Sequence, residues 1–274
     1  MPDAYADISK ADPETLERIA QVLEVQAPDA QQRGMLRQYL ADVDFPPGAR
    51  VLEIGCGTGA VTRELALRPR VAQVTGVDSS PVLLERARTY GGHMKNLFFE
   101  LGDGRALQFD QESFDVVVLH RTLSHVPQPE GILVEARRVL RTGGSLAIFD
   151  ADYASLTFAS GPCDPFHACA EAAVSVIAYD PWLIRRLPYL LNLAGFAPGH
   201  ARGFNYLSWP DPSYLLAILD QGAKALLVSG RIDAAGEESL KAEARRRIQE
   251  GTFYSGISYV SVITAKVQPQ PLSA

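Results

Sequence analysis

The stretch from Ala49 to Thr62 constrains the fold of this chain more than any other. It reads Ala-Arg-Val-Leu-Glu-Ile-Gly-Cys-Gly-Thr-Gly-Ala-Val-Thr, an apolar run followed by three glycines at alternate positions. The run is typical of a buried parallel strand, and a helix is expected after it, with Thr58 or Thr62 as its N-cap. Such a unit directs backbone N–H groups and a positive helix end at one bound group, which glycines allow to approach closely. The stretch therefore predicts a nucleotide or cofactor loop in an α/β protein.

The glycine pattern alone is compatible with two kinds of cofactor, and also with a turn that only connects two elements. Gly55, Gly57 and Ala60 satisfy the dinucleotide pattern G-x-G-x-x-G/A, which binds NAD or FAD. An acid at the end of the strand, Glu53, and a third glycine, Gly59, extend the pattern to Glu-x-Gly-x-Gly-x-Gly. In this form the stretch resembles motif I of the class I S-adenosylmethionine (SAM)-dependent methyltransferases. The resemblance implies that the acid and the glycine loop hold the amino-acid end of SAM.

Aspartates lie where the next two predicted strands end. The strand predicted over 71–78 ends in an aspartate that can accept hydrogen bonds from ribose hydroxyls, in NAD and SAM sites alike. The strand predicted over 96–101 leads into a Gly-Asp-Gly phrase, which resembles the segment that places an aspartate beside the adenine amino group in class I methyltransferases. The alternative for the first aspartate is a surface residue without a ligand, and the alternative for the second is a turn residue. The cofactor contacts expected from these segments are Asp78, Ser79, Asp103, Gly104 and Arg105.

The strand predicted over 113–119 delivers two histidines and an arginine to the carboxyl edge of the sheet, where ligands bind in open α/β sheets. His120 and His125 are the candidate catalytic residues, because a neutral imidazole can take a proton from an acceptor. Two alternatives stay open: His120 contacts the methionine end of SAM, and His125 only packs at the entry to the next helix. Arg121 is expected to bind a carboxylate of the substrate.

Two helices are expected before the first strand. Residues 13–26 show the 3.6-residue apolar period, with Asp12 as N-cap and proline at the first helical position, and a second helix is expected over 29–41. In many methyltransferases of this type such a segment covers the active site. We therefore assign residues 1–48 to an N-terminal helical lid. From it Tyr39 could reach the cofactor or the substrate, and ordinary packing of this side chain is the alternative.

Across residues 49–150 the resemblance is strong, with four motifs in the right order. The run from Glu135 to Leu146 is similar to the branch that includes the ubiquinone and menaquinone C-methyltransferases, known as methyltransferase type 11. The resemblance implies an α/β fold: a doubly wound, Rossmann-like, seven-stranded and mostly parallel sheet with an antiparallel last strand, plus helical cap or lid elements. Residues 49–150 would form its SAM-binding core.

After residue 150 the resemblance weakens. We assign residues 151–274 to a substrate-pocket half with helical inserts at 151–180 and 209–251 and with closing strands. The elements expected there are helices over 166–178, 181–196, 212–228 and 236–250, and strands over 200–208 and 257–266.

Composition narrows the choice of partner. The 274 residues are 47% hydrophobic and carry a net charge of −6, and their basic residues are dispersed, so we expect a small-molecule substrate and no nucleic acid. No run of 18 apolar residues and no secretion signal occur, so we expect no membrane association. Three cysteines without a CxxC pair favour a cytoplasmic location, and Cys56 is expected to line the cofactor loop as a small residue. The chain would act as a monomer or a homodimer.

Three hypotheses of function follow. The first is a SAM-dependent methyltransferase that transfers a methyl group to a small metabolite or natural product by in-line displacement, with S-adenosyl-L-homocysteine as product. The second is a SAM-binding protein that has lost methyl transfer or catalyses another reaction. The third, an NAD-dependent oxidoreductase, lacks a Tyr-x-x-x-Lys pair. No metal is expected, because the His120, Asp150 and Asp152 set does not reproduce the pattern of metal-dependent catechol-type methyltransferases.

Overall fold

The computed structural model describes residues 8, 11–26, 29–209 and 211–267. Seven strands form one mixed sheet in the order β3-β2-β1-β4-β5-β7-β6. Strands β1 to β5 are parallel, and β7 is antiparallel to both of its neighbours, which confirms the predicted fold class. The strands are β1 Ala49–Ile54, β2 Val71–Asp78, β3 Leu97–Leu101, β4 Phe114–His120, β5 Leu140–Thr157, β6 His200–Leu207 and β7 Gly256–Ala265.

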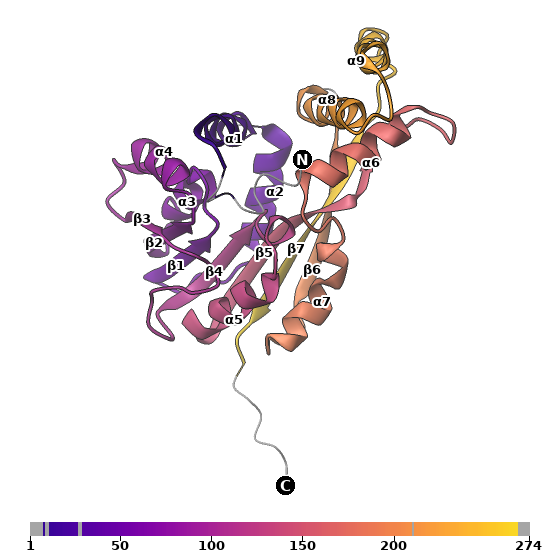
Figure 1. The fold of residues 1–274 in the computed structure, drawn as a ribbon. Coiled ribbons are helices and arrows are strands. Elements are labelled where there is room, and N and C mark those ends of the chain that lie inside the picture. The colour runs from indigo at the N-terminus through magenta and orange to yellow at the C-terminus, as the bar shows by residue number, and fades with distance from the viewer. Residues whose placement is uncertain (1–7, 9–10, 27–28, 210, 268–274) are drawn as a thin grey trace.

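Helices cover both faces of this sheet (Figure 1). Helices α2 and α3 pack on one face, and α5 and α7 pack on the other. The central strands are apolar on both faces, because Val116 and Val118 belong to the first core and Val117 and Leu119 belong to the second. The helices are α1 Pro13–Gln26, α2 Ala30–Ala41, α3 Ala60–Ala66, α4 Pro81–Gly91, α5 Pro129–Val139, α6 Phe166–Ile177, α7 Leu183–Leu193, α8 Ser213–Val228 and α9 Ala234–Gln249.

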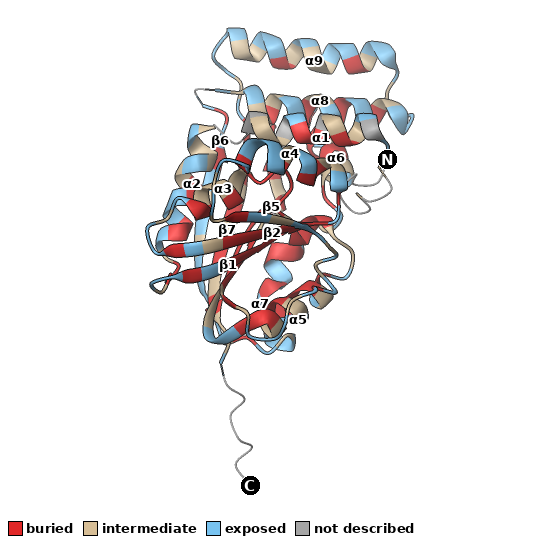
Figure 2. Cartoon of the chain, turned by 90° about the vertical axis from the view of Figure 1, so that its left-hand side faces the viewer, coloured by how far each residue is buried: buried red, intermediate tan, exposed pale blue. Residues whose placement is uncertain are grey.

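Helices α1, α6, α8 and α9 lie beyond the sheet edge at which the parallel strands end (Figure 1). Figure 2 shows that α9 is largely exposed, with only isolated buried positions, whereas the central strands β1 and β4 are mostly buried. In the described part of the chain, no helix is both long enough and apolar enough to cross a bilayer.

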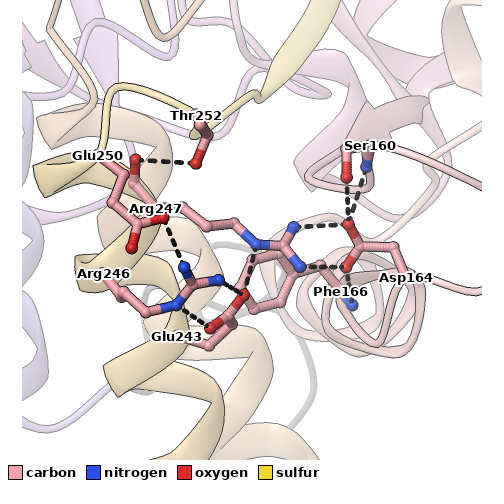
Figure 3. Close-up of polar contacts among 8 residues, drawn as sticks. All are labelled: Ser160, Asp164, Phe166, Glu243, Arg246, Arg247, Glu250 and Thr252. Atoms are coloured by element: carbon pink, nitrogen blue, oxygen red, sulfur yellow. Dashed lines mark hydrogen bonds and ion pairs between the residues drawn. The ribbon is translucent and has the colours of Figure 1, made fainter.

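Charged contacts fasten α9 to the loop before α6 (Figure 3). The Asp164 carboxylate accepts from the backbone and the hydroxyl of Ser160 at 2.9 and 2.8 Å, and from Arg247 at 2.6 Å. The Arg247 guanidinium also lies 4.4 Å from the centre of the Phe166 ring and donates to Glu243. This Asp164–Arg247 clasp orients a helix that has little apolar surface of its own to bury.

The structure corrects the predicted cap of α3. Neither Thr58 nor Thr62 caps this helix; Gly59 is the N-cap, in the left-handed conformation with φ 78°, and no side chain bonds to the first turn. Thr62 stands inside the first turn, and its hydroxyl donates to Glu53 instead. The predicted Asp12 cap of α1 is confirmed, because its carboxylate accepts from the Thr15 N–H. The N-cap of α4 is Ser80, whose hydroxyl accepts from the Leu83 N–H.

The apolar run over 145–150 predicts the fifth strand, and β5 extends past both of its ends, over Leu140–Thr157. It continues to Thr157 because its antiparallel partner β7 pairs with it beyond the parallel part of the sheet. The expected boundary after residue 150 therefore falls inside a strand, and the first part of the insert at 151–180 belongs to the sheet.

Candidate functional site

A cavity of about 1290 Å³ lies at the carboxyl ends of β1, β2 and β4. Its wall includes most of the residues that the sequence analysis singled out, and it also includes residues of α1, α2, α6 and α8. Of the predicted site residues, those on the wall are Glu53, Gly55, Cys56, Gly57, Asp78, Ser79, Asp103, Gly104, Arg105, His120, Arg121 and His125.

The glycine loop is bound tightly to its neighbours on both sides. The N–H groups of Gly55 and Cys56 both donate to the carbonyl of Val77 on β2, at 2.8 and 3.0 Å. Gly55 has φ 76°, and a Cβ there would lie 2.5 Å from the Thr122 side chain. Thr122, which no sequence motif indicated, thus follows β4 and packs directly against the loop. Burial also raises the pKa of the Cys56 thiol well above its usual value, which agrees with a space-filling role.

Gly59 does not belong to the cavity wall. It turns the chain into α3, and a Cβ at this position would lie 2.7 Å from the Phe99 ring. Its requirement for glycine thus comes from the left-handed backbone and the close packing of β3. Contact with a cofactor stays a prediction for this residue.

Glu53 is a buried carboxylate at the end of β1. Its side chain is 2% exposed and accepts a hydrogen bond from the Thr62 hydroxyl at 2.6 Å. Burial, opposed by that bond and reinforced by the charge of Asp78, raises the pKa of Glu53 to about 8. A cationic group placed beside this carboxylate would favour its ionised form. The chemistry of the position therefore suits an ammonium group.

Asp78 ties the end of β2 to both neighbouring segments. One carboxylate oxygen accepts from the Gly57 N–H and the other from the Ser80 N–H, each at 2.8 Å. Burial raises the pKa of Asp78 in spite of these bonds. The carboxylate is thereby fixed in position on the cavity wall, where it keeps further acceptor capacity for hydroxyl groups.

Asp103 lies after β3 in a tight arrangement with Arg105. The aspartate accepts from the backbone N–H of Arg105 at 2.9 Å, and its second oxygen forms an ion pair with the guanidinium at 2.8 Å. This hydrogen bonding holds the pKa of Asp103 below its usual value. The carboxylate therefore stays ionised at neutral pH, as an acceptor for an amino group requires.

His120 is held in a stack of aromatic rings. Its ring centre lies 4.9 Å from that of Phe149, and its Nδ1 lies 3.0 Å from the Tyr39 hydroxyl. Burial, together with the charge of Arg121, lowers the pKa of His120 to about 3. The imidazole is therefore neutral at physiological pH. Tyr39 is completely buried behind the histidine and does not line the cavity, so its contact with a ligand stays a prediction.

His125 lies in a 3₁₀ turn, Leu123–His125, after β4. Its Nε2 is 3.1 Å from the Tyr153 hydroxyl, and the two rings meet edge to face. The preceding Ser124 anchors the turn, because its N–H and hydroxyl both donate to the buried Asp150 at 3.1 and 2.7 Å. The structure thus pairs His125 with a tyrosine that lies beyond the predicted fifth strand, a partner that sequence reasoning missed.

Helix α1 closes one side of the cavity, as a lid segment would. Thr15, Ile19 and Leu23 line the wall, and Glu24 reaches the Arg63 guanidinium of α3 at 3.1 Å. A second ion pair, Glu17 with Arg86 at 2.8 Å, joins α1 to α4.

Comparisons with known proteins agree with this geometry. The family model described as "Methyltransferase domain" matches residues 52–148. An uncharacterised 37.1 kDa protein in transposon TN4556 of Streptomyces fradiae is 35% identical over 156 residues, which are 57% of this chain and 45% of that protein. The demethylmenaquinone methyltransferase of Tropheryma whipplei strain Twist is 40% identical over 101 residues, 37% of this chain and 41% of that enzyme. This chain thus covers less than half the length of each relative.

Solved structures show the same architecture over a longer stretch. The crystal structure of the YcgJ protein from Bacillus subtilis aligns with 86% of this chain and 100% of its own, at a TM-score of 0.61 and 17% identity. That identity establishes the fold alone. The sequence match therefore identifies residues 52–148 as a methyltransferase domain.

Proposed function

We propose that this protein is a SAM-dependent methyltransferase that acts on a small-molecule acceptor. One observation carries the proposal: Glu53, Asp78 and Asp103 stand at or after the ends of β1, β2 and β3, and all three line the same cavity. The set fits the cofactor in order, with Glu53 toward its ammonium group, Asp78 toward its ribose hydroxyls and Asp103 toward its adenine amino group.

The bound cofactor would supply a methyl group on a positively charged sulfur, so the protein's own part is to bind, orient and exclude water. The rigid contacts of Asp78 and of the glycine loop serve orientation. Helix α1 and its ion pairs to α3 and α4 serve the exclusion of water.

The two histidines receive different roles. His120 stays neutral and is fixed by Tyr39 and Phe149, so we assign it to contact with the cofactor's methionine end. His125 is the better candidate for taking a proton from an acceptor, because it lines the cavity in the turn after β4 and is not enclosed in the ring stack that holds His120.

Two features support a small acceptor. The site is a cavity closed by helices on several sides, and a quinone-type acceptor is named for one of the relatives. The net charge of −6 argues against nucleic acid. We also propose a reducing, cytoplasmic setting, which the free state of all three cysteines supports, and either a monomer or a homodimer.

Calorimetric titration with SAM, S-adenosylhomocysteine and NAD tests the cofactor. We expect micromolar binding of the first two, weakened at least tenfold (about 1.4 kcal/mol) by Asp78→Ala or Asp103→Ala. Asp44→Ala, an exposed aspartate outside the cavity wall, is the matched control and should leave affinity unchanged. Binding of NAD in place of SAM would overturn the proposal.

Incubation with labelled SAM and panels of phenols, acids and amines tests transfer. Transfer of label to any acceptor supports the enzyme. SAM binding without transfer to any member of the panels would favour the second hypothesis, a SAM-binding protein that has lost methyl transfer or catalyses another reaction.

A further inference from the structure

An arginine and three tyrosines meet beside the two histidines of the cavity. The Arg121 guanidinium donates to the Tyr214 hydroxyl at 3.3 Å, and that hydroxyl lies 3.1 Å from the hydroxyl of Tyr259. Gln32 donates to the Tyr259 hydroxyl at 3.2 Å. The cluster thus draws residues from α2, α8 and β7 to the residue that directly follows β4.

The backbone of Arg121 is in the left-handed conformation, with φ 54°. This conformation is uncommon for a side chain with a Cβ and costs on the order of 1 kcal/mol. The N–H of Arg121 donates to the Phe149 carbonyl at 2.6 Å, which holds the turn to β5. The fold therefore maintains an unfavourable backbone conformation at a residue whose side chain lines the cavity.

Tyr153 adds a further donor to the same part of the wall. Its side chain is 3% exposed, and its hydroxyl lies 3.1 Å from His125 Nε2. Burial raises the pKa of Tyr153, and the charge and hydrogen bond of Arg121 oppose that rise. The phenol is therefore protonated at neutral pH. Guanidinium N–H groups and phenol O–H groups are suitable donors for an oxyanion.

An apolar wall adjoins this cluster. It consists of Val176 and Ile177 on α6 and of Ile218, Ala225 and Val228 on α8. Three of these, Val176, Ala225 and Val228, also line a neighbouring cavity of about 460 Å³. Beyond these shared side chains the second cavity is mostly polar, with Glu171, Ser175 and Arg231 on its wall. The apolar surface that can accompany an apolar group is therefore the part of the main cavity between α6 and α8.

We propose that the acceptor is an organic anion with an apolar body: its acidic group binds Arg121 and the hydroxyls of Tyr153 and Tyr214, and its body lies between α6 and α8. The inference rests on the proposed function, since it names the class of acceptor. Carboxylate and phosphate share the required chemistry, and the test separates them.

Matched probes test the site. The full-length protein is saturated with S-adenosylhomocysteine and titrated calorimetrically with 1-naphthylacetate, 1-naphthyl phosphate and the uncharged 1-naphthylacetamide. We expect at least one anion to bind ten times more tightly than the amide, and the stronger of the two identifies the acidic group. Arg121→Gln should weaken the binding of that anion until its affinity equals that of the amide.

Two further variants control the result. Lys224→Gln removes a positive charge from the wall of the same cavity and should change the preference for the anion less than twofold. Tyr214→Phe removes one hydroxyl of the cluster and should weaken the anion by about threefold, which provides a test if Arg121→Gln does not fold.

The outcomes separate the two proposals. Equal affinity for acid and amide, no binding of any probe, or a preference that Lys224→Gln abolishes and Arg121→Gln retains would overturn the anion site alone. Failure of S-adenosylhomocysteine to bind would overturn the proposed function, and the same acid–amide comparison without it would then decide the anion site.

Discussion

Glu53 couples ligand binding to a proton. With a pKa of about 8, raised by burial, it is mostly protonated at pH 7 in the ligand-free protein. Binding of an ammonium group favours the carboxylate and so releases that proton. We expect calorimetry of S-adenosylhomocysteine at pH 7, in buffers of different ionisation enthalpy, to show release of most of one proton, and affinity to increase from pH 6 to 7. Glu53→Gln should abolish the release; identical enthalpies in all buffers would refute the linkage.

The same carboxylate lowers the stability of the free protein at high pH. Its native pKa, about 8, lies above the ordinary value of 4.5, so the native state holds a proton that the unfolded chain loses above pH 4.5. Stability is therefore lost as the pH rises from 4.5 through 8. We expect Glu53→Gln to raise the free energy of unfolding by at least about 1 kcal/mol at pH 8 and to change it little at pH 5, as measured by urea unfolding. A variant less stable than wild type at pH 8 would contradict this.

Comparison of two glycines with the same backbone conformation separates the effect of backbone strain from that of steric crowding by neighbouring side chains. Gly59 and Gly143 have φ 78° and 81°, but an added Cβ meets the Phe99 ring at 2.7 Å in the first case and nothing within 4 Å in the second. We expect Gly143→Ala to destabilise by about 1 kcal/mol, from backbone strain alone. Gly59→Ala should cost about 1–3 kcal/mol more, because the core must repack. Equal decreases in the free energy of unfolding, measured with urea, would show that the Phe99 ring can move aside without an energetic penalty.

At the scale of elements, the Asp164–Arg247 clasp determines how firmly α9 is held. Arg247 is 15% exposed and its partner 4%, whereas the neighbouring Arg246 is 53% exposed. We expect Arg247→Ala to destabilise by about 3 kcal/mol, since it leaves a buried carboxylate without its cation. Arg246→Ala, the matched control, should cost less than about 1 kcal/mol. Urea unfolding measures both, and similar losses would show that burial of the pair is not decisive.

Sequence periodicity predicted most elements because each was marked locally. Strand β2 was predicted over the residues it occupies, since an apolar run with an acid at its end needs no distant information. The end of β5 and the cap of α3 were not predicted in this way. The first depends on pairing with β7, about a hundred residues further along the chain, and the second on a hydrogen bond between Thr62 and Glu53.

For the whole molecule, the cavity is where separate parts of the chain meet. Helix α1 contributes Ile19 and Leu23 to its wall, while α9 contributes nothing among the described residues. Binding of S-adenosylhomocysteine should therefore slow amide hydrogen exchange in α1 and leave α9 unchanged. At a ligand concentration 100 times Kd, total stabilisation should be about 2.7 kcal/mol. Exchange in α1 that does not respond to the ligand would contradict its role as a lid.

The residues of the candidate site also fall into two groups, those that local sequence patterns predicted and those that they did not. Glu53, Asp78 and Asp103 could be predicted because each follows a recognisable strand, and parallel strands end at one edge. Tyr153 and Tyr214 could not, since one lies in the extension of β5 and the other on α8 in an insert without a motif. Their meeting with Arg121 depends on how these late segments fold back over the sheet.

The insertion of β7 between β5 and β6 also bears on how the chain is synthesised. Within the described residues, β6 forms sheet pairs with β7 alone, although it precedes β7 in the chain. Strands β1 to β5 can assemble as they emerge from the ribosome, but β6 must wait for its partner to be translated. A premature stop between Leu207 and Gly256 would thus remove two strands from the sheet, although only one of them would be missing from the polypeptide.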